Sequence, residues 1–139
     1  MGQKAVSDCG RSRALESDRR RRSLGQRGEA IAVAYLQRHG YAILARNWRC
    51  AVGELDIVAR DGDCLALVEV RARHGDTYGS AEDSITPRKQ AKLVEVAQTY
   101  LQATAQEDST WRIDVIAIQI GPDDRVLSLN HIRNAVEGV

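Results

Sequence analysis

The sequence lacks the features that mark several common classes of protein. No stretch of about 18 or more consecutive residues is apolar, so we expect no membrane span. The first 22 residues contain no apolar core, so we expect no secretory signal. The three cysteines, Cys9, Cys50 and Cys64, have no paired spacing, which indicates a reducing compartment and no structural zinc. These absences predict a cytoplasmic protein without membrane contacts.

Aromatic side chains and net charge are also scarce. Aromatic residues make up 4% of the chain and no exposed apolar stripe is evident, so a scaffold that docks onto a DNA-processing partner has little support. The net charge is +1, so any affinity for nucleic acid must come from a local patch. The length of 139 residues predicts one domain. A chain of this size buries about 70% of its unfolded surface, so a core can form without disulfides.

The beginning of the chain is polar and basic. It carries Arg11, Arg13 and the run Arg19 to Arg22, and it has no aromatic residue. We expect residues 1–22 to form a disordered basic arm and residues 23–139 to form a single domain. The arm is either a solubilising tail or a segment that attracts phosphates without sequence preference, and the sequence leaves both open.

Periodicity and capping signals predict an α/β protein. Ser23 and Gln26 form a capping box before an apolar helical stripe, and Gly40 can end that helix. Thr86 and Pro87 are typical of the start of a second helix. The predicted order is α-β-β-β-α-β-β, in a mixed β-sheet flanked by helices. Its elements are a helix at 23–39, a strand at 41–48, a hairpin at 53–73, a helix starting at 86–87, and strands at 111–120 and 125–131.

The hairpin is the most informative stretch. Two apolar runs flank Asp61-Gly62, which predicts a type I′ turn because both residues tolerate positive φ. This register places Arg60 opposite Asp63 and Glu54 opposite Glu69. Alternation then predicts one wholly apolar face and one face with charges at its end. The apolar face is Leu55, Ile57, Ala59, Ala66, Val68 and Val70, and the other is Glu54, Asp56, Val58, Leu65, Leu67, Glu69 and Arg71.

The charged end of the hairpin is a candidate metal site. Glu54 and Glu69 repel each other across the strands, and Asp56 lies diagonal to Glu69 at roughly 7 Å. Such carboxylates can lean together onto one hard cation such as Mg²⁺ or Mn²⁺, which prefers oxygen ligands. The other interpretation is a solvated ion-pair network at a sheet edge. The apolar residues on the same face favour a site.

Four other charged or polar residues have two interpretations each. Glu29 either complements the dipole of the first helix or points at the acidic cluster. Lys89 and Gln90 either are surface residues or face an anionic substrate. Asp114, within an apolar strand, fits a hydrogen-bonded structural acid better than a catalyst.

Five short motifs resemble, in order, those of the YraN-like family of small bacterial proteins. The resemblance covers roughly Gly25 to Ile132, and that family is similar to PD-(D/E)xK nucleases and to archaeal Holliday-junction resolvases. It therefore implies a restriction-endonuclease-like fold. The motifs are Gly25–Ala30, Asn47–Arg49, Gly53–Asp56, Val68–Arg71 and Thr86–Gln90.

The resemblance also implies roles for single residues. Asp56 and Glu69 would fill the two metal-binding positions, and Glu29 would match an acid from the first helix. Gln90 would match a polar position on the second helix. Arg71 occupies the place of the motif lysine. Arginine stays charged, so Arg71 can stabilise developing charge but cannot act as a general base.

We therefore expect a metal-dependent nuclease-like protein that acts on DNA phosphodiesters, with branched DNA as one candidate substrate. Resolvases of similar fold act as dimers, so the resemblance also implies a homodimer. The alternative function is a catalytically silent nucleic-acid-binding module. Either function would use the same basic residues for affinity, namely Arg49, Arg73, Arg88, Lys89 and Lys92.

Overall fold

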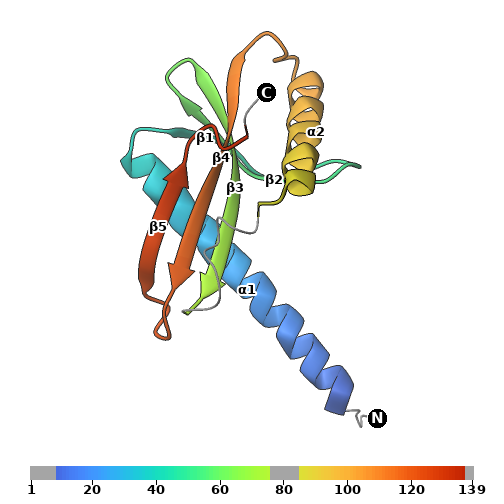
Figure 1. Ribbon diagram of the computed structural model, residues 1–139, viewed down its shortest axis with the longest axis vertical. Coiled ribbons are helices and arrows are strands. Elements are labelled where there is room, and N and C mark those ends of the chain that lie inside the picture. Colours follow the sequence, from blue (N-terminus) through green and yellow to red (C-terminus); the bar gives the residue numbers. More distant parts are fainter. Residues whose placement is uncertain (1–8, 76–84, 137–139) are drawn as a thin grey trace.

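The computed structural model describes residues 9–75 and 85–136, and within its first helix it describes side chains for Arg19 and from Ser23 onward. The elements follow the predicted α-β-β-β-α-β-β order (Figure 1). They are α1 Cys9–Arg38, β1 Ala42–Arg49, β2 Glu54–Asp61, β3 Cys64–His74, α2 Pro87–Ala103, β4 Thr110–Ile120 and β5 Val126–Ile132.

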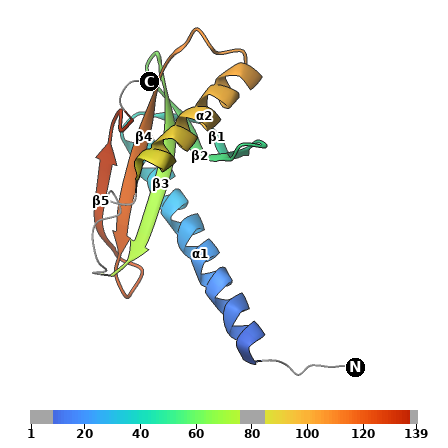
Figure 2. The ribbon, with the colours of Figure 1, turned by 45° about the vertical axis from the view of Figure 1, so that its right-hand side comes forward.

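The five strands form one mixed sheet in the order β1-β2-β3-β4-β5. Strands β3 and β4 are parallel because α2 carries the chain across between them, and the other pairs are antiparallel. Helices α1 and α2 lie on opposite faces of the sheet (Figures 1 and 2). The predicted α/β class is confirmed. None of the described helices has an apolar segment long enough to cross a bilayer.

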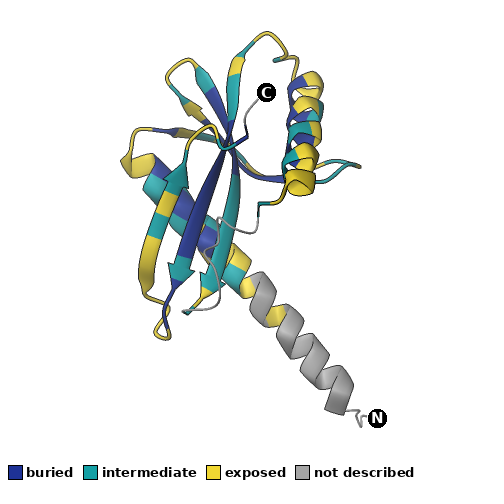
Figure 3. Ribbon diagram, viewed as in Figure 1, coloured by how far each residue is buried: buried dark blue, intermediate teal, exposed yellow. Residues whose placement is uncertain are grey.

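Each face of the sheet supports its own hydrophobic core. On the α2 side, Leu93 and Val96 pack on Val58 and Leu67. On the α1 side, Ala32 and Leu36 are fully buried with residues of β2, β3 and β4. Strand β4 is buried along nearly its whole length, as its run of apolar residues on both faces predicted (Figure 3).

Helix α1 begins earlier than the sequence predicted. Its backbone is helical from Cys9, so Ser23 lies inside the helix and the predicted capping box there is wrong. Alanine, leucine and the arginines before Ser23 favour a helix, and one serine does not interrupt it. The early part of α1 projects beyond the sheet (Figure 1). Residues 1–8 lie outside the described part, and the division into arm and domain stays a prediction.

The hairpin register differs from the prediction by two residues. Asp61 pairs with Cys64, so the loop is Gly62-Asp63. Gly62 has φ 61° whereas Asp63 does not have a positive φ, which is typical of a type II′ turn rather than the predicted type I′ turn. Because side chains alternate with a period of two, this shift keeps every paired side chain on its predicted face.

One residue of the predicted apolar face is on the other side. The β2–β3 ladder ends at Ile57–Val68, whereas β2 stays paired with β1. Leu55, beyond that end, packs in the α2-side core instead of with Ile57. The ring of Trp48, its partner on β1, packs edge-on against the Tyr100 ring, with 5.1 Å between the ring centroids. The β1–β2 ribbon therefore turns toward α2, and we call the place where β2 leaves β3 the strand fork.

The packing of α1 on β3 makes a test of the fold. A Cβ on Gly28 would lie 2.8 Å from the Cβ of Ala72, whereas a Cβ on Gly25 would meet nothing within 4 Å. We expect Gly28→Ala to lower the free energy of unfolding by about 1–2 kcal/mol because α1 must shift. Gly25→Ala should raise it by about 0.5–1 kcal/mol through helix propensity. Urea denaturation measures both, and equal effects of the two variants would contradict this packing.

Candidate functional site

The strand fork brings Asp56 and Glu69 together. Continued one residue past Ile57–Val68, the β2–β3 register places Asp56 opposite Glu69. Their carboxyl groups share a side-chain hydrogen bond. The two acids, called the acid pair below, therefore lie closer than the diagonal arrangement that the sequence predicted.

Burial of the acid pair opposes its ionisation. The side chain of Asp56 is nearly buried, and its Oδ2 accepts a hydrogen bond of 2.8 Å from the Val70 N–H. Burial, followed by the charge of Glu69, raises the pKa of Asp56 from 3.8 to about 7. Burial also raises the pKa of Glu69, although the Arg71 charge works against this shift. A cation beside the pair would favour the ionised form that burial disfavours.

Arg71 adds a positive group beside the acid pair. Its terminal nitrogen lies 3.1 Å from Glu69 Oε2, and the two side chains are 27% and 16% exposed. Among the described residues, the Arg71 Nε is a buried nitrogen with no hydrogen-bond partner. The fold therefore leaves one donor of this guanidinium unpaired.

Two grooves reach the acid pair. One, of about 200 Å³, is lined by the pair, Arg71 and residues of α2 that include Lys89 and Lys92. The Lys89 charge reaches far enough to lower the pKa of Glu69, although burial is the larger effect and raises it. The second groove, of about 370 Å³, connects the pair to α1 at Glu29. The acid pair is thus reached from the cationic start of α2 and from α1.

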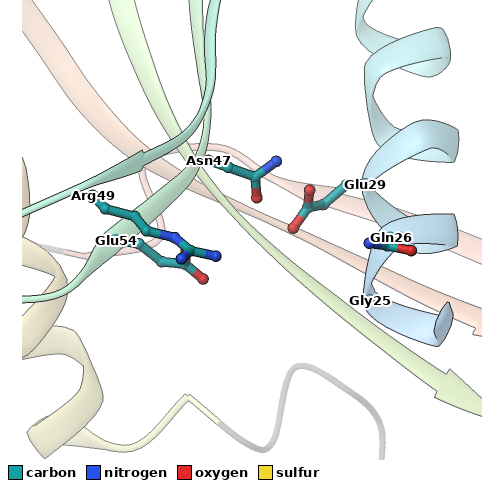
Figure 4. Close-up of a pocket in the computed structure, with 6 residues that line it drawn as sticks. All are labelled: Gly25, Gln26, Glu29, Asn47, Arg49 and Glu54. Carbon is teal, nitrogen blue, oxygen red and sulfur yellow. The ribbon is translucent and has the colours of Figure 1, made fainter. Parts of the chain in front are cut away.

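A third groove, of about 440 Å³, continues along α1 and β1 (Figure 4). Figure 4 shows the Glu29 carboxyl facing the Asn47 side chain. Burial and the Asp56 charge raise the pKa of Glu29, while Asn47 lowers it. Of the two interpretations of Glu29, the structure favours an acid that lies near the acidic cluster.

Glu54 lines all three grooves but already has a partner. Its Oε2 accepts a hydrogen bond of 3.1 Å from Arg49 Nε, and both side chains are well exposed. Within residues 9–75 and 85–136, no group of three or more His, Cys, Asp or Glu side chains is close enough to hold a metal ion. The acid pair is therefore the candidate ligand set, and Glu54 as a metal ligand stays a prediction.

The remaining predicted residues lie apart from the acid pair. Gln90 donates its amide to the Ile85 carbonyl at 3.4 Å and lines neither groove that contains the pair. Arg88 is exposed at the start of α2, and Arg73 is half-buried on β3. The structure does not bring Gln90 to the site.

As predicted, Thr86 caps α2, since its hydroxyl accepts a hydrogen bond of 3.2 Å from the Lys89 N–H.

Asp114 has the structural role that the sequence predicted. It is fully buried and accepts hydrogen bonds from Arg112 Nε at 2.9 Å and from the Asn134 N–H at 2.9 Å, and it contacts His131 Nε2 at 2.8 Å. Burial acts to raise the pKa of Asp114, but these bonds outweigh it and lower that pKa. Every side of this carboxylate is occupied by protein groups.

From the sequence, Asn47 was named only as part of the motif Asn47–Arg49 and was assigned no role. It lies inside β1 with φ 54°, a left-handed conformation that few residues except glycine adopt. Asparagine tolerates this conformation better than most residues, but nothing in an alternating strand pattern predicts that it occurs there.

The fold and the acid pair define an α/β protein with one mixed five-stranded sheet and a cluster of carboxylates where two strands part. The chain belongs to the uncharacterised protein family UPF0102, whose model matches residues 28–118. A UPF0102 protein of Roseiflexus castenholzii is 51% identical over 120 residues, which cover 85% of this chain and 96% of the relative. A UPF0102 protein of Pelotomaculum thermopropionicum is 47% identical over 115 residues, covering 83% and 96%.

These matches confirm that the chain is a member of the YraN-like family that its motifs resemble. The matched segment contains Glu29, the acid pair and Arg71. The relation to PD-(D/E)xK nucleases stays a prediction, as do the roles that it implies.

The raised pKa of Asp56 makes a prediction about stability. The folded state holds this proton up to about pH 7 and the unfolded state only to about 3.8, so the free energy of unfolding falls as the pH rises through this range. Asp56→Asn removes this loss, keeps an acceptor for Val70, and can donate to Glu69. We therefore compare the free energy of unfolding of Asp56→Asn with that of wild type, with EDTA present. We expect this difference to be about 2–4 kcal/mol more favourable to the variant at pH 8 than at pH 4.

Urea denaturation at both pH values measures this difference. Glu95→Gln, an exposed acid on α2, is the matched control and should show no such gain. A pH-independent difference between wild type and Asp56→Asn would contradict the buried, protonated carboxyl.

Proposed function

We propose that this protein is a metal-dependent nuclease-like protein that acts on DNA phosphodiesters. The supporting observation is the acid pair at the strand fork, where Asp56 and Glu69 are held together against their own repulsion. Perturbed carboxyls in a groove mark functional sites more often than structural ones. The groove beside them is lined by Arg71, Lys89 and Lys92, which suits a polyanion.

The residues present fit a hard divalent cation. Asp56 and Glu69 would hold Mg²⁺ or Mn²⁺ through carboxylate oxygens, and Mg²⁺ commonly binds through one or two carboxylates while keeping several waters. When bound, such an ion lowers the pKa of a coordinated water and polarises a phosphate oxygen. The negative pair that burial makes costly would then be neutralised.

The side chains around the acid pair would act on the phosphate. The Arg71 side chain is 27% exposed, so its guanidinium can donate to a phosphate oxygen while a terminal nitrogen remains paired with Glu69. Lys89 and Lys92 would attract the backbone of the same strand. Arg71 cannot accept a proton, so it would stabilise charge and leave proton transfer to another group.

Metal binding is the direct test. At pH 8, where Asp56 is ionised in the absence of metal, calorimetry should show Mn²⁺ binding to wild type. Asp56→Ala and Glu69→Gln should each weaken it by about tenfold or more, whereas Glu95→Gln should not. Equal affinity of wild type and Asp56→Ala would remove the acid pair as a metal site.

The same variants should distinguish DNA cleavage by this protein from cleavage by a contaminating nuclease. Wild type is incubated with four-way junctions, flaps and single-stranded DNA in Mg²⁺ or Mn²⁺, and products should form only with metal. Glu69→Gln, purified in the same way, should form none. Products from Glu69→Gln at the wild-type rate would show that another nuclease made them.

A second function has one specific observation in its favour. The Arg71 guanidinium is paired with Glu69 and keeps its charge at all pH values of interest, so the site lacks the proton acceptor that a lysine can provide. A nucleic-acid-binding module without cleavage fits this arrangement. This function predicts that the protein binds DNA under conditions in which no metal-dependent cleavage products form.

Both functions predict the same cationic surface, and its salt dependence can be measured. Lys89→Ala and Lys92→Ala should each reduce the slope of log K against log salt by about 0.9 if each contacts one phosphate. Arg60→Ala, an exposed cation at the far end of β2, is the control and should leave the slope unchanged. Fluorescence anisotropy with a labelled duplex gives these slopes. Unchanged slopes in both lysine variants would place the DNA elsewhere.

A further inference from the structure

Asn47 adopts an unusual backbone conformation at a place where the strand does not require it. It has φ 54° inside β1, between the pairs Arg46–Ile57 and Trp48–Leu55. The ladder continues on both sides, so Asn47 is neither at a strand end nor in a loop. A non-glycine residue with positive φ is strained, and such strain persists where the surrounding structure enforces it.

The position of Asn47 relates the strain to the acid pair. Between its two neighbouring pairs, Asn47 lies across from Asp56 on β2. Its side chain faces Glu29 of α1 across the groove (Figure 4). The neighbouring Trp48 is held against Tyr100 of α2, so the chain is anchored directly after Asn47.

Glu29 requires such a partner to stay in the groove. Its long side chain is only partly buried, and it is repelled by Asp56 and by Glu54. A glutamate under these conditions is expected to turn to solvent unless a donor holds it. The Asn47 amide faces the Glu29 carboxyl and is placed to be that donor, whereas Arg46 acts only through its charge.

We propose that Asn47 is a positioning residue that holds the Glu29 carboxyl in the groove that leads to the acid pair, so that the charge of one acid from α1 adds to the field of the two acids from the sheet. This inference rests on the proposed metal site. It explains the left-handed backbone of Asn47 in β1 by the need to orient one acid, Glu29, on α1. Asn47 itself need not touch a metal ion or a phosphate.

Two substitutions separate this role from a structural one. Asn47→Gly keeps the left-handed backbone without strain and removes only the amide, so its melting temperature should equal or exceed that of wild type. Asn47→Asp keeps the shape of the side chain but replaces the donor with a second negative charge toward Glu29. Both variants should weaken Mn²⁺ binding, with an expected loss of about tenfold for Asn47→Gly.

A double-mutant cycle tests whether Asn47 acts through Glu29. Mn²⁺ affinity is measured by calorimetry for wild type, Asn47→Gly, Glu29→Gln and the double variant. If Asn47 acts by holding Glu29, the double variant binds as Glu29→Gln does. Independent, additive losses would overturn the proposal, and so would wild-type affinity in Asn47→Gly.

A metal-free crystal structure of Asn47→Gly distinguishes this inference from the proposed function. We expect the Glu29 side chain to leave the groove while the β1 backbone is unchanged. Glu29 in the same place as in Figure 4 would overturn the positioning role. If wild type binds no Mn²⁺, the proposed function fails, and this structure still decides whether Asn47 positions Glu29.

Discussion

The end of hydrogen bonding between β2 and β3 is the constraint on which the site depends. Past Ile57 and Val68 the two strands separate, and β2 follows β1 toward α2. The freed N–H of Val70 is satisfied by the Asp56 carboxylate instead of by a strand partner. Asp56 is thereby fixed in a buried position beside Glu69, at a point that is open to grooves on both sides.

Among the residues whose side chains the structure describes, the buried acids Asp56 and Asp114 show the difference between a structural carboxylate and a reactive one. Asp114 is surrounded by Arg112, His131 and a backbone N–H, and its pKa is lowered. Asp56 has one backbone donor and a second acid as its neighbour, and its pKa is raised. The first carboxylate has its partners within the fold, whereas the second gains if a cation arrives from outside.

Much of the fold could be predicted from local patterns. The element order, the Thr86 cap of α2 and the division of most hairpin side chains between two faces followed from periodicity and turn chemistry. The start of α1 could not be predicted, because Ser23 can cap a helix or lie within one. The hairpin register was wrong by two residues, because Asp61-Gly62 and Gly62-Asp63 are both acceptable turns and local preference does not choose between them.

The sequence by itself determined which side chains share a face for most of the hairpin, with Leu55 as the exception, because alternation with a period of two survives a register shift of two. It therefore placed Asp56, Glu69 and Arg71 on one side of the hairpin. Only the tertiary structure decided that β2 leaves β3 at this point, that α1 packs closely enough to bring Glu29 to the groove, and that Asn47 turns to meet it. These features depend on contacts between elements that are distant in the chain, and local residue patterns carry no information about such contacts.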